Sequence, residues 1–253
     1  MKAMILAAGL GTRLRPLTDH RPKALVEVGG RTLLEIALTR LSSFGIREVI
    51  INVHHFADMI LDYLKANNSF GIRIEVSRED VLLDTGGGLK KAAYFFLQNS
   101  SSSEEPFILH NVDVISTIDL RRMAQFHADH RALATLAVQE RQTTRYLLFD
   151  EHLELCGRRI GRDGESELVR RSPRTAALAF SGIHVISPRF FSLMTEEGVF
   201  SIIAPYLRLA ARGEKILAFR SDEYQWRDLG RLDDVMQADQ DARQLLSAPS
   251  KRI

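Results

Sequence analysis

The stretch Leu6-Ala-Ala-Gly-Leu-Gly-Thr-Arg-Leu-Arg-Pro-Leu-Thr18, followed by Pro22-Lys-Ala-Leu25, decides the fold. It overlaps the apolar run 2–8, which indicates a buried parallel strand because both faces of such a strand are covered. A glycine-rich loop at the carboxyl end of a strand is typical of the edge of an α/β sheet where ligands bind. The stretch therefore predicts both the sheet and the position of its site.

Strand and helix patterns alternate downstream of this loop. Thr32-Leu-Leu-Glu35 has capping-box spacing and predicts a helix whose apolar residues repeat at three and four until Gly45. Strand patterns follow at 48–53, 72–76 and 107–110, with helix patterns at 56–66 and 89–97. This alternation predicts a doubly wound parallel sheet with helices on both faces.

The second half of the chain is less regular. Strand candidates lie at 133–138, 146–149, 178–185 and 216–219, and helix patterns at 200–212 and 232–246. We therefore expect a three-layer α/β/α Rossmann-like fold with a mixed, mostly parallel sheet. We expect one domain over 1–253, with a first half at about 1–115, a second half at about 116–230 and a C-terminal helix at about 231–247.

Composition excludes several classes of protein. The 253 residues are 45% hydrophobic and 26% charged, which is ordinary for a globular chain. A net charge of +2 leaves no excess of cations for nucleic acid, and no apolar run approaches the roughly 20 residues of a membrane span. The single cysteine, Cys156, excludes an intramolecular disulfide. We expect a cytoplasmic protein that binds neither nucleic acid nor membrane.

The glycine-rich loop has the chemistry of a polyphosphate site. Gly9 and Gly11 allow successive backbone N–H groups to point at an anion, and Arg13 and Lys23 add two cations. The dinucleotide pattern Gly-x-Gly-x-x-Gly fails at Leu14, which disfavours an oxidoreductase, and the P-loop pattern is absent. The loop predicts binding of a polyphosphate by another route.

Three further segments carry candidate site residues. Gly86–Gly88 weaken the helix start that they precede, which predicts that something comes close there; the alternative is a turn with an N-cap at Asp84 or Thr85. Asp113 follows a strand and faces the same crevice, where it would hold Mg²⁺ or simply cap a loop. Asp228, in Trp226-Arg-Asp-Leu-Gly230, is by itself equally consistent with an N-cap.

Residues 6–25 resemble, without a break, the N-terminal signature of the sugar-1-phosphate nucleotidylyltransferases. The resemblance implies that Lys23 contacts phosphate at the reacting centre, that Arg13 and Asp113 are catalytic with it, and that Asp113 and Asp228 hold Mg²⁺. One departure is Val112, which stands where the family usually has glycine. The nucleotide-binding residues that the resemblance implies are Leu6, Ala7, Ala8, Gly9, Gly11, Thr12, Arg13, Thr85, Gly86, Gly87 and Asn111.

The sugar-phosphate site is less defined by this resemblance. Relatives have Glu-Lys-Pro where this chain has Arg170, Arg171 and Arg174, so an arginine would replace the usual lysine. We predict Arg171, together with Lys23 and Gly182, for the sugar phosphate. The alternative is a solvated basic strand edge.

The resemblance implies an Mg²⁺-dependent enzyme, a monomer or homodimer, whose half at about 1–115 binds the nucleotide and whose half at about 116–230 binds the sugar. It would join a nucleoside triphosphate to a sugar 1-phosphate and release pyrophosphate. The alternative is a catalytically silent, regulatory homologue that binds a nucleotide-sugar, which the presence of Arg13, Lys23, Asp113 and Asp228 disfavours. The sequence fixes neither the base nor the sugar.

Overall fold

The computed structural model describes residues 1–98, 105–161 and 164–247. Its central sheet has the strand order β11-β10-β9-β12-β6-β1-β4-β5, with β8 joined to β12 and β13 to β8. The N-terminal part, β5-β4-β1-β6, is entirely parallel. The bounds of these strands are β1 Ala3–Leu6, β4 Glu48–Val53, β5 Arg73–Arg78 and β6 Phe107–Asn111.

The second half of the chain joins this sheet through the long strand β12, Ala176–Ile186, which runs antiparallel to β6, β8 and β9. A register shift between Phe180 and His184, around Gly182 with its φ of +74°, bends β12 between these partners. The other strands are β8 Ala134–Gln139, β9 Arg145–Phe149, β10 Leu155–Ile160, β11 Ser166–Leu168 and β13 Ile216–Arg220. The expected mixed sheet is confirmed.

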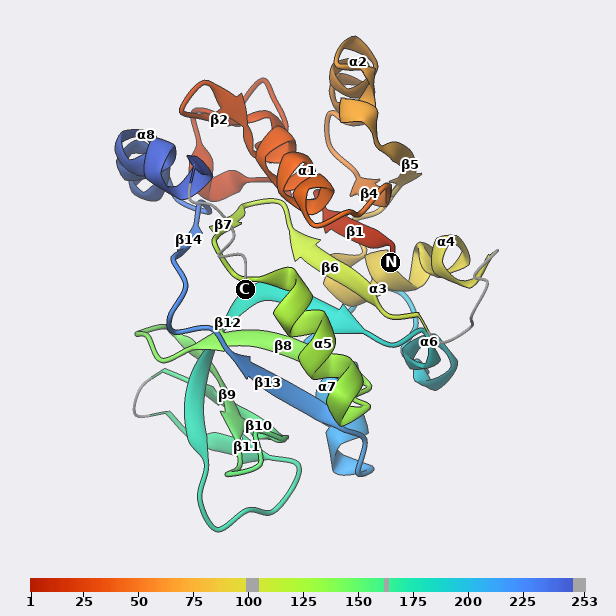
Figure 1. Cartoon of the computed structure of the whole chain (residues 1–253), viewed down its shortest axis with the longest axis vertical. Coiled ribbons are helices and arrows are strands. Elements are labelled where there is room, and N and C mark those ends of the chain that lie inside the picture. Colours follow the sequence, from red (N-terminus) through yellow and green to blue (C-terminus); the bar gives the residue numbers. More distant parts are fainter. Residues whose placement is uncertain (99–104, 162–163, 248–253) are drawn as a thin grey trace.

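Helices cover both faces of the sheet (Figure 1). These helices form two groups on opposite faces. Ile5 of β1 packs in a core with the first group, and its neighbour Met4 packs in a core with the second group. The first group is α1 Leu33–Ser43, α2 Ala57–Ala66 and α5 Leu120–His130. The second group is α3 Asp84–Lys91, α4 Ala93–Leu97, α6 Arg189–Leu193 and α7 Ile203–Ala211. The expected three layers are therefore confirmed.

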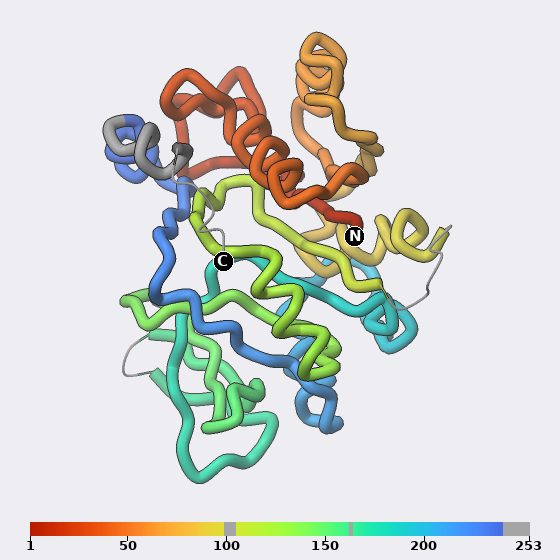
Figure 2. Tube along the Cα trace, in the orientation of Figure 1, coloured from red at the N-terminus to blue at the C-terminus, as the bar shows by residue number. Residues whose placement is uncertain are grey.

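The chain returns to its N-terminal half after β13 (Figure 2). There β14, Trp226–Asp228, pairs antiparallel with β7, Val114–Ser116, and α8, Leu232–Ser247, packs beside β2. Strand β2, Glu27–Val28, pairs with β3, Arg31–Thr32. Short 3₁₀ helices complete the fold at η1 Thr12–Leu14, η2 Lys23–Leu25 and η3 Asn68–Gly71.

Local sequence signals explain where some elements begin, while the sequence did not predict other elements. The Thr32 hydroxyl accepts a hydrogen bond from the Glu35 amide at 3.1 Å, so the predicted cap of α1 is confirmed. The prediction that Gly86–Gly88 precede their helix is wrong, because α3 begins at Asp84 and contains them. Strand pairs β2–β3 and β7–β14, strands β10 and β11, and helices α5 and α6 were not predicted. No helix within the described residues is long and apolar enough to span a membrane.

Candidate functional site

Among the described residues, two cavities lie around the glycine-rich loop. The smaller, here the loop cavity, has a volume of about 390 Å³, and the larger, here the arginine cavity, about 1110 Å³. The loop cavity is lined by Leu6, Ala7, Ala8, Gly9, Lys23, Asn52, Leu82, Asp84, Thr85, Asn111, Val112, Asp113 and Val199. The arginine cavity is lined by Arg13, Arg141, Gln142, Thr143, Thr144, Arg145, Trp226, Arg227, Asp228, Arg231, Asp234 and Gln237.

The loop cavity lies where three parallel strands end together. Leu6 at the end of β1 is in register with Asn52 of β4 and Asn111 of β6. The amide of Ala7 donates to the Asn52 side chain at 2.8 Å, and the amide of Val112 donates to the Leu6 carbonyl at 3.1 Å. These contacts fix the start of the loop against the carboxyl ends of its neighbours, where α/β sheets bind ligands.

A network of buried polar groups holds Asn52, which lines this cavity, in place. Sequence reasoning missed this network. Asn52 donates to one oxygen of Glu79 at 2.7 Å, and the Leu83 amide donates to the other at 2.9 Å. A Cβ atom on Gly88 would lie 2.7 Å from Oε1 of Glu79, so only glycine leaves room for this carboxylate. The available signal was a polar asparagine inside the apolar run of β4.

The glycines of α3 approach the protein itself. The amide of Gly86 donates to the Phe200 carbonyl at 2.9 Å, and a Cβ on Gly87 would lie 2.5 Å from the Gly198 carbonyl oxygen. Both are buried, and neither is among the described residues that line the loop cavity. Thr85 does line it, while its hydroxyl accepts from the Ile202 amide at 3.0 Å.

Two carboxylates that are distant in sequence meet at the boundary between the cavities. Lys23 forms an ion pair with Asp113, and both side chains are largely buried. The Asp113 carbonyl accepts from the Leu229 amide at 2.8 Å, which fixes the end of β14 beside it. Desolvation by the surrounding protein, and then the negative charge of Asp113, raise the pKa of Asp228, whereas Lys23 and Arg13 lower it. The structure therefore brings Asp113, Asp228, Lys23 and Arg13 together.

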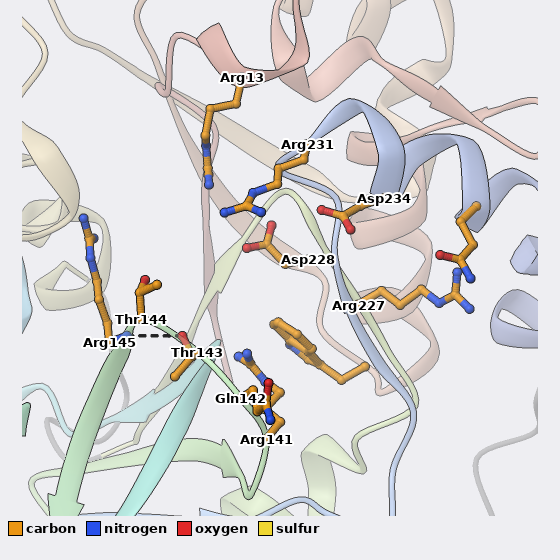
Figure 3. A pocket seen from close by; sticks show the side chains of 12 residues that line it. Arg13, Arg141, Gln142, Thr143, Thr144, Arg145, Arg227, Asp228, Arg231 and Asp234 are labelled. Carbon is orange, nitrogen blue, oxygen red and sulfur yellow. Dashed lines mark hydrogen bonds between the residues drawn. The ribbon is translucent and has the colours of Figure 1, made fainter. Parts of the chain in front are cut away.

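Arg13 reaches Asp228 across Gly230. Gly11, with a φ of +66°, turns the chain into η1, which contains Thr12 and Arg13. A Cβ on Gly230 would lie 2.8 Å from Nη2 of Arg13 and 2.8 Å from Oδ1 of Asp228. Figure 3 shows the Arg13 side chain extending toward Asp228, with Arg231 beside it. Sequence reasoning assigned Gly230 only a turn.

The donor set at this boundary fits Mg²⁺. No group of three or more His, Cys, Asp or Glu side chains that could hold a metal occurs in the described part of the chain. Mg²⁺ binds through one or two carboxylates while it keeps waters and substrate phosphates as its other ligands. Asp113 and Asp228 supply that number, and a cation between them would offset the repulsion that raises the pKa of Asp228.

The arrangement of the predicted sugar-phosphate residues is mixed. Gly182 is buried beside the loop cavity, since a Cβ there would lie 2.9 Å from Nδ2 of Asn111. Arg171 is exposed and lines neither cavity, so the structure does not bring it to the site. Its neighbour Arg170 forms ion pairs with Asp150 and Glu154.

Several known proteins resemble this chain in sequence or in fold. The sequence profile of the family described as Nucleotidyl transferase matches residues 2–148. An N-acetylmuramate alpha-1-phosphate uridylyltransferase from Caulobacter vibrioides is 36% identical over 222 residues, 83% of this chain and 85% of that protein. A mannose-1-phosphate guanyltransferase from Yarrowia lipolytica is 28% identical over 242 residues, 93% of this chain and 62% of that protein. The crystal structure of HddC from Yersinia pseudotuberculosis complexed with GMP-PN has a TM-score of 0.74 at 21% identity, covering 95% of this chain and 99% of that one.

Proposed function

This chain belongs to the sugar-1-phosphate nucleotidylyltransferase family, and we propose that it joins a nucleoside triphosphate to a sugar 1-phosphate in an Mg²⁺-dependent reaction that releases pyrophosphate. One observation carries the proposal. Two cations, Arg13 and Lys23, and two carboxylates, Asp113 and Asp228, converge where the loop cavity meets the arginine cavity. The two cavities give each reactant its own space, and the convergence lies between them.

The nucleoside triphosphate enters the loop cavity in this proposal. A Cβ on Gly9 would have no atom within 4 Å, so the backbone of the loop is open to close approach by phosphate oxygens. Thr85 and Asn111 line the same cavity and offer polar groups to the nucleoside. The sugar 1-phosphate then occupies the arginine cavity, which is large and rich in cationic and hydroxyl side chains.

The chemistry needs alignment and charge neutralisation more than proton transfer. An oxygen of the sugar 1-phosphate attacks the α-phosphorus, a new P–O bond forms, and the bond to the leaving pyrophosphate breaks. The nucleophile is already an oxyanion, so no general base is required. In this proposal Lys23, paired with Asp113, contacts the phosphates at the reacting centre, and Arg13, beside Asp228, contacts the leaving pyrophosphate. Mg²⁺, held by Asp113 and Asp228, would orient the triphosphate and offset its charge.

The base and the sugar are tested with a matrix of nucleoside triphosphates against sugar 1-phosphates, read by pyrophosphate release. The relatives' names make UTP and GTP the first nucleotides to include, with N-acetylmuramate 1-phosphate and mannose 1-phosphate. We expect Mg²⁺-dependent turnover with at least one pair. We also expect D113A to lose it, because the Lys23 ion pair and one metal ligand disappear together.

Two controls sharpen this test. D113N keeps the size of the side chain and separates loss of charge from loss of packing. D129A removes an exposed carboxylate of α5 that lines neither cavity, and this variant is expected to turn over normally. Near-normal turnover by D113A would contradict the assignment. Binding of a nucleotide-sugar by the wild type without turnover of any pair would favour the silent homologue.

A further inference from the structure

We propose that Arg141 binds the phosphate of the sugar 1-phosphate, in the role that the sequence resemblance implied for Arg171. The proposal rests on the function proposed above and names a residue of its acceptor site. Arg141 lies in the loop between β8 and β9 and lines the arginine cavity. Arg171 is exposed and lines neither cavity.

The Arg141 side chain is held in place from two sides. Its Nη2 donates to the Phe180 carbonyl at 2.7 Å, and its guanidinium carbon lies 3.7 Å from the centre of the Trp226 ring. Stacking on an indole orients the planar guanidinium, and a fixed fork binds phosphate oxygens with less loss of entropy than a free side chain. The contacts therefore preorganise Arg141 rather than neutralise its charge.

Trp226 is itself fixed by the same strand. Its Nε1 donates to the Ser181 carbonyl at 2.7 Å. The carbonyls of Phe180 and Ser181 thus receive two hydrogen bonds just before the positive φ of Gly182, where β12 shifts register. Arg141 and Trp226, which this irregular segment of β12 holds in place, form part of the lining of the arginine cavity.

The position of Arg141 suits an attacking phosphate. In Figure 3, Arg13 and Arg231 lie on one side of Asp228, and Arg141 lies on the other. Burial lowers the pKa of Arg141, while the negative charge of Asp228 raises it, so these two groups are electrostatically linked. The Nε of Arg141 is buried and has no hydrogen-bond partner within the described residues. An anion between Arg141 and the reacting centre would offset this incompletely compensated charge.

Other arginines are worse placed for this role. Arg170 is already neutralised by its ion pairs with Asp150 and Glu154. Arg145 lines the same cavity but is exposed. In Figure 3, Thr144 lies between Arg145 and Asp228. Arg141 combines a guanidinium plane held by two contacts with an electrostatic link to Asp228.

Steady-state kinetics separate Arg141 from Arg171. The assay uses the substrate pair with the highest wild-type turnover, and the variants are R141M, R141K and, as matched control, R171M. We expect kcat/KM for the sugar 1-phosphate to fall by about 10²-fold in R141M, since loss of one partner of a charge pair is costly. R141K should recover part of it, because it keeps the charge without the fork. KM for the nucleoside triphosphate and all constants of R171M should stay within about twofold.

Either of two kinetic results would overturn the proposed role of Arg141. It fails if R171M loses as much as R141M, or if KM for the sugar 1-phosphate is unchanged in R141M. Thermal unfolding identifies a variant that has lost its fold, and R141K then decides, because lysine preserves the stem and the charge. A structural role alone would lower kcat or stability without raising that KM.

A binding measurement tests Arg141 without turnover. Trp226 is the only tryptophan in the sequence, so its fluorescence reports on the ring against which Arg141 stacks. The probes are glucose, mannose and N-acetylmuramate 1-phosphates, titrated in EDTA with the nucleoside triphosphate present. We expect a saturable change in the wild type and in R171M, and at least tenfold weaker binding in R141M. Equal affinity in R141M, or no saturable change with any probe, overturns the proposal.

The turnover assay and the fluorescence titration can fail separately. If no substrate pair yields pyrophosphate, nucleotidyl transfer fails as the function. A saturable signal that depends on Arg141 would still establish the phosphate-binding residue. If turnover is found but is indifferent to Arg141, only the residue assignment fails.

Discussion

Replacing Gly230 with alanine should damage the active site while leaving the fold intact. A Cβ atom there would lie 2.8 Å from Nη2 of Arg13 and 2.8 Å from Oδ1 of Asp228. Ordinary contacts begin near 3.4 Å, so each group would have to move by about 0.6 Å. Both atoms are ends of side chains that can move, and Gly230 does not occupy the left-handed region that disfavours alanine. The strain is therefore released by displacing the two charged groups.

The magnitude follows from this displacement. A misplacement of 1 Å in a catalytic group costs about 10²-fold in rate, so we expect G230A to lower kcat/KM by about tenfold or more. The free energy of unfolding should change by less than about 1 kcal/mol, because a glycine-to-alanine change also lowers the entropy of the unfolded chain. Pyrophosphate release measures the first quantity and urea denaturation the second.

A double-mutant cycle with R13K checks that the effect acts through Arg13. Lysine has no Nη2, so one of the two close contacts is absent in that background, and G230A should cost less there than in the wild type. Strictly additive losses would remove Arg13 from the explanation. If G230A keeps its activity within about twofold of the wild type, the close contacts at Gly230 do not control catalysis.

Three further predictions address other parts of the molecule. G86A should lower the free energy of unfolding by about 1–3 kcal/mol in urea, because its Cβ would clash with the Phe200 ring, 2.5 Å from Cδ2, and would lie 2.9 Å from the Phe200 carbonyl oxygen. Burial lowers the pKa of His127 to about 4, so the unfolded state binds more protons below pH 6.5, and stability should fall as pH drops from there toward 4, by up to about 1.4 kcal/mol per pH unit. H127Q should flatten that slope in urea melts. E79Q should lower the free energy of unfolding by about 1–3 kcal/mol in thermal unfolding. Glutamine has an NH₂ group in place of one carboxylate oxygen, so it cannot accept from both Asn52 and the Leu83 amide.

Much of the fold could be predicted because its signals are local. The apolar run of β1, the capping box of α1 and the alternation through β6 each depend on residues near one another in the chain. The loop cavity follows from the same logic, since parallel strands end at a common edge. Lys23 and Asp113 were predicted on this basis, and the structure places them in an ion pair.

The errors have a common physical cause. Clustered glycines show that something approaches closely, but not what it is, and for Gly86 it is Phe200 of a distant loop. Basic residues near a family motif likewise do not reveal which of them reaches the cavity. Arg141 does so because the Phe180 carbonyl and the Trp226 ring orient it, and the Ser181 carbonyl in turn holds that ring; none of these contacts has a sequence period.

The arrangement of the candidate-site charges depends on one of the shortest strand pairs among the described residues. Asp228 reaches Asp113 because β14, three residues long, pairs with β7 of the same length, and three residues are too few for a periodic pattern. The large sheet continues from β5 to β11 without using either strand. A small displacement of the two carboxylates can therefore occur without breaking the strand pairing of the large sheet. This separation is the reason that a substitution at Gly230 should reduce catalysis before it reduces the free energy of unfolding.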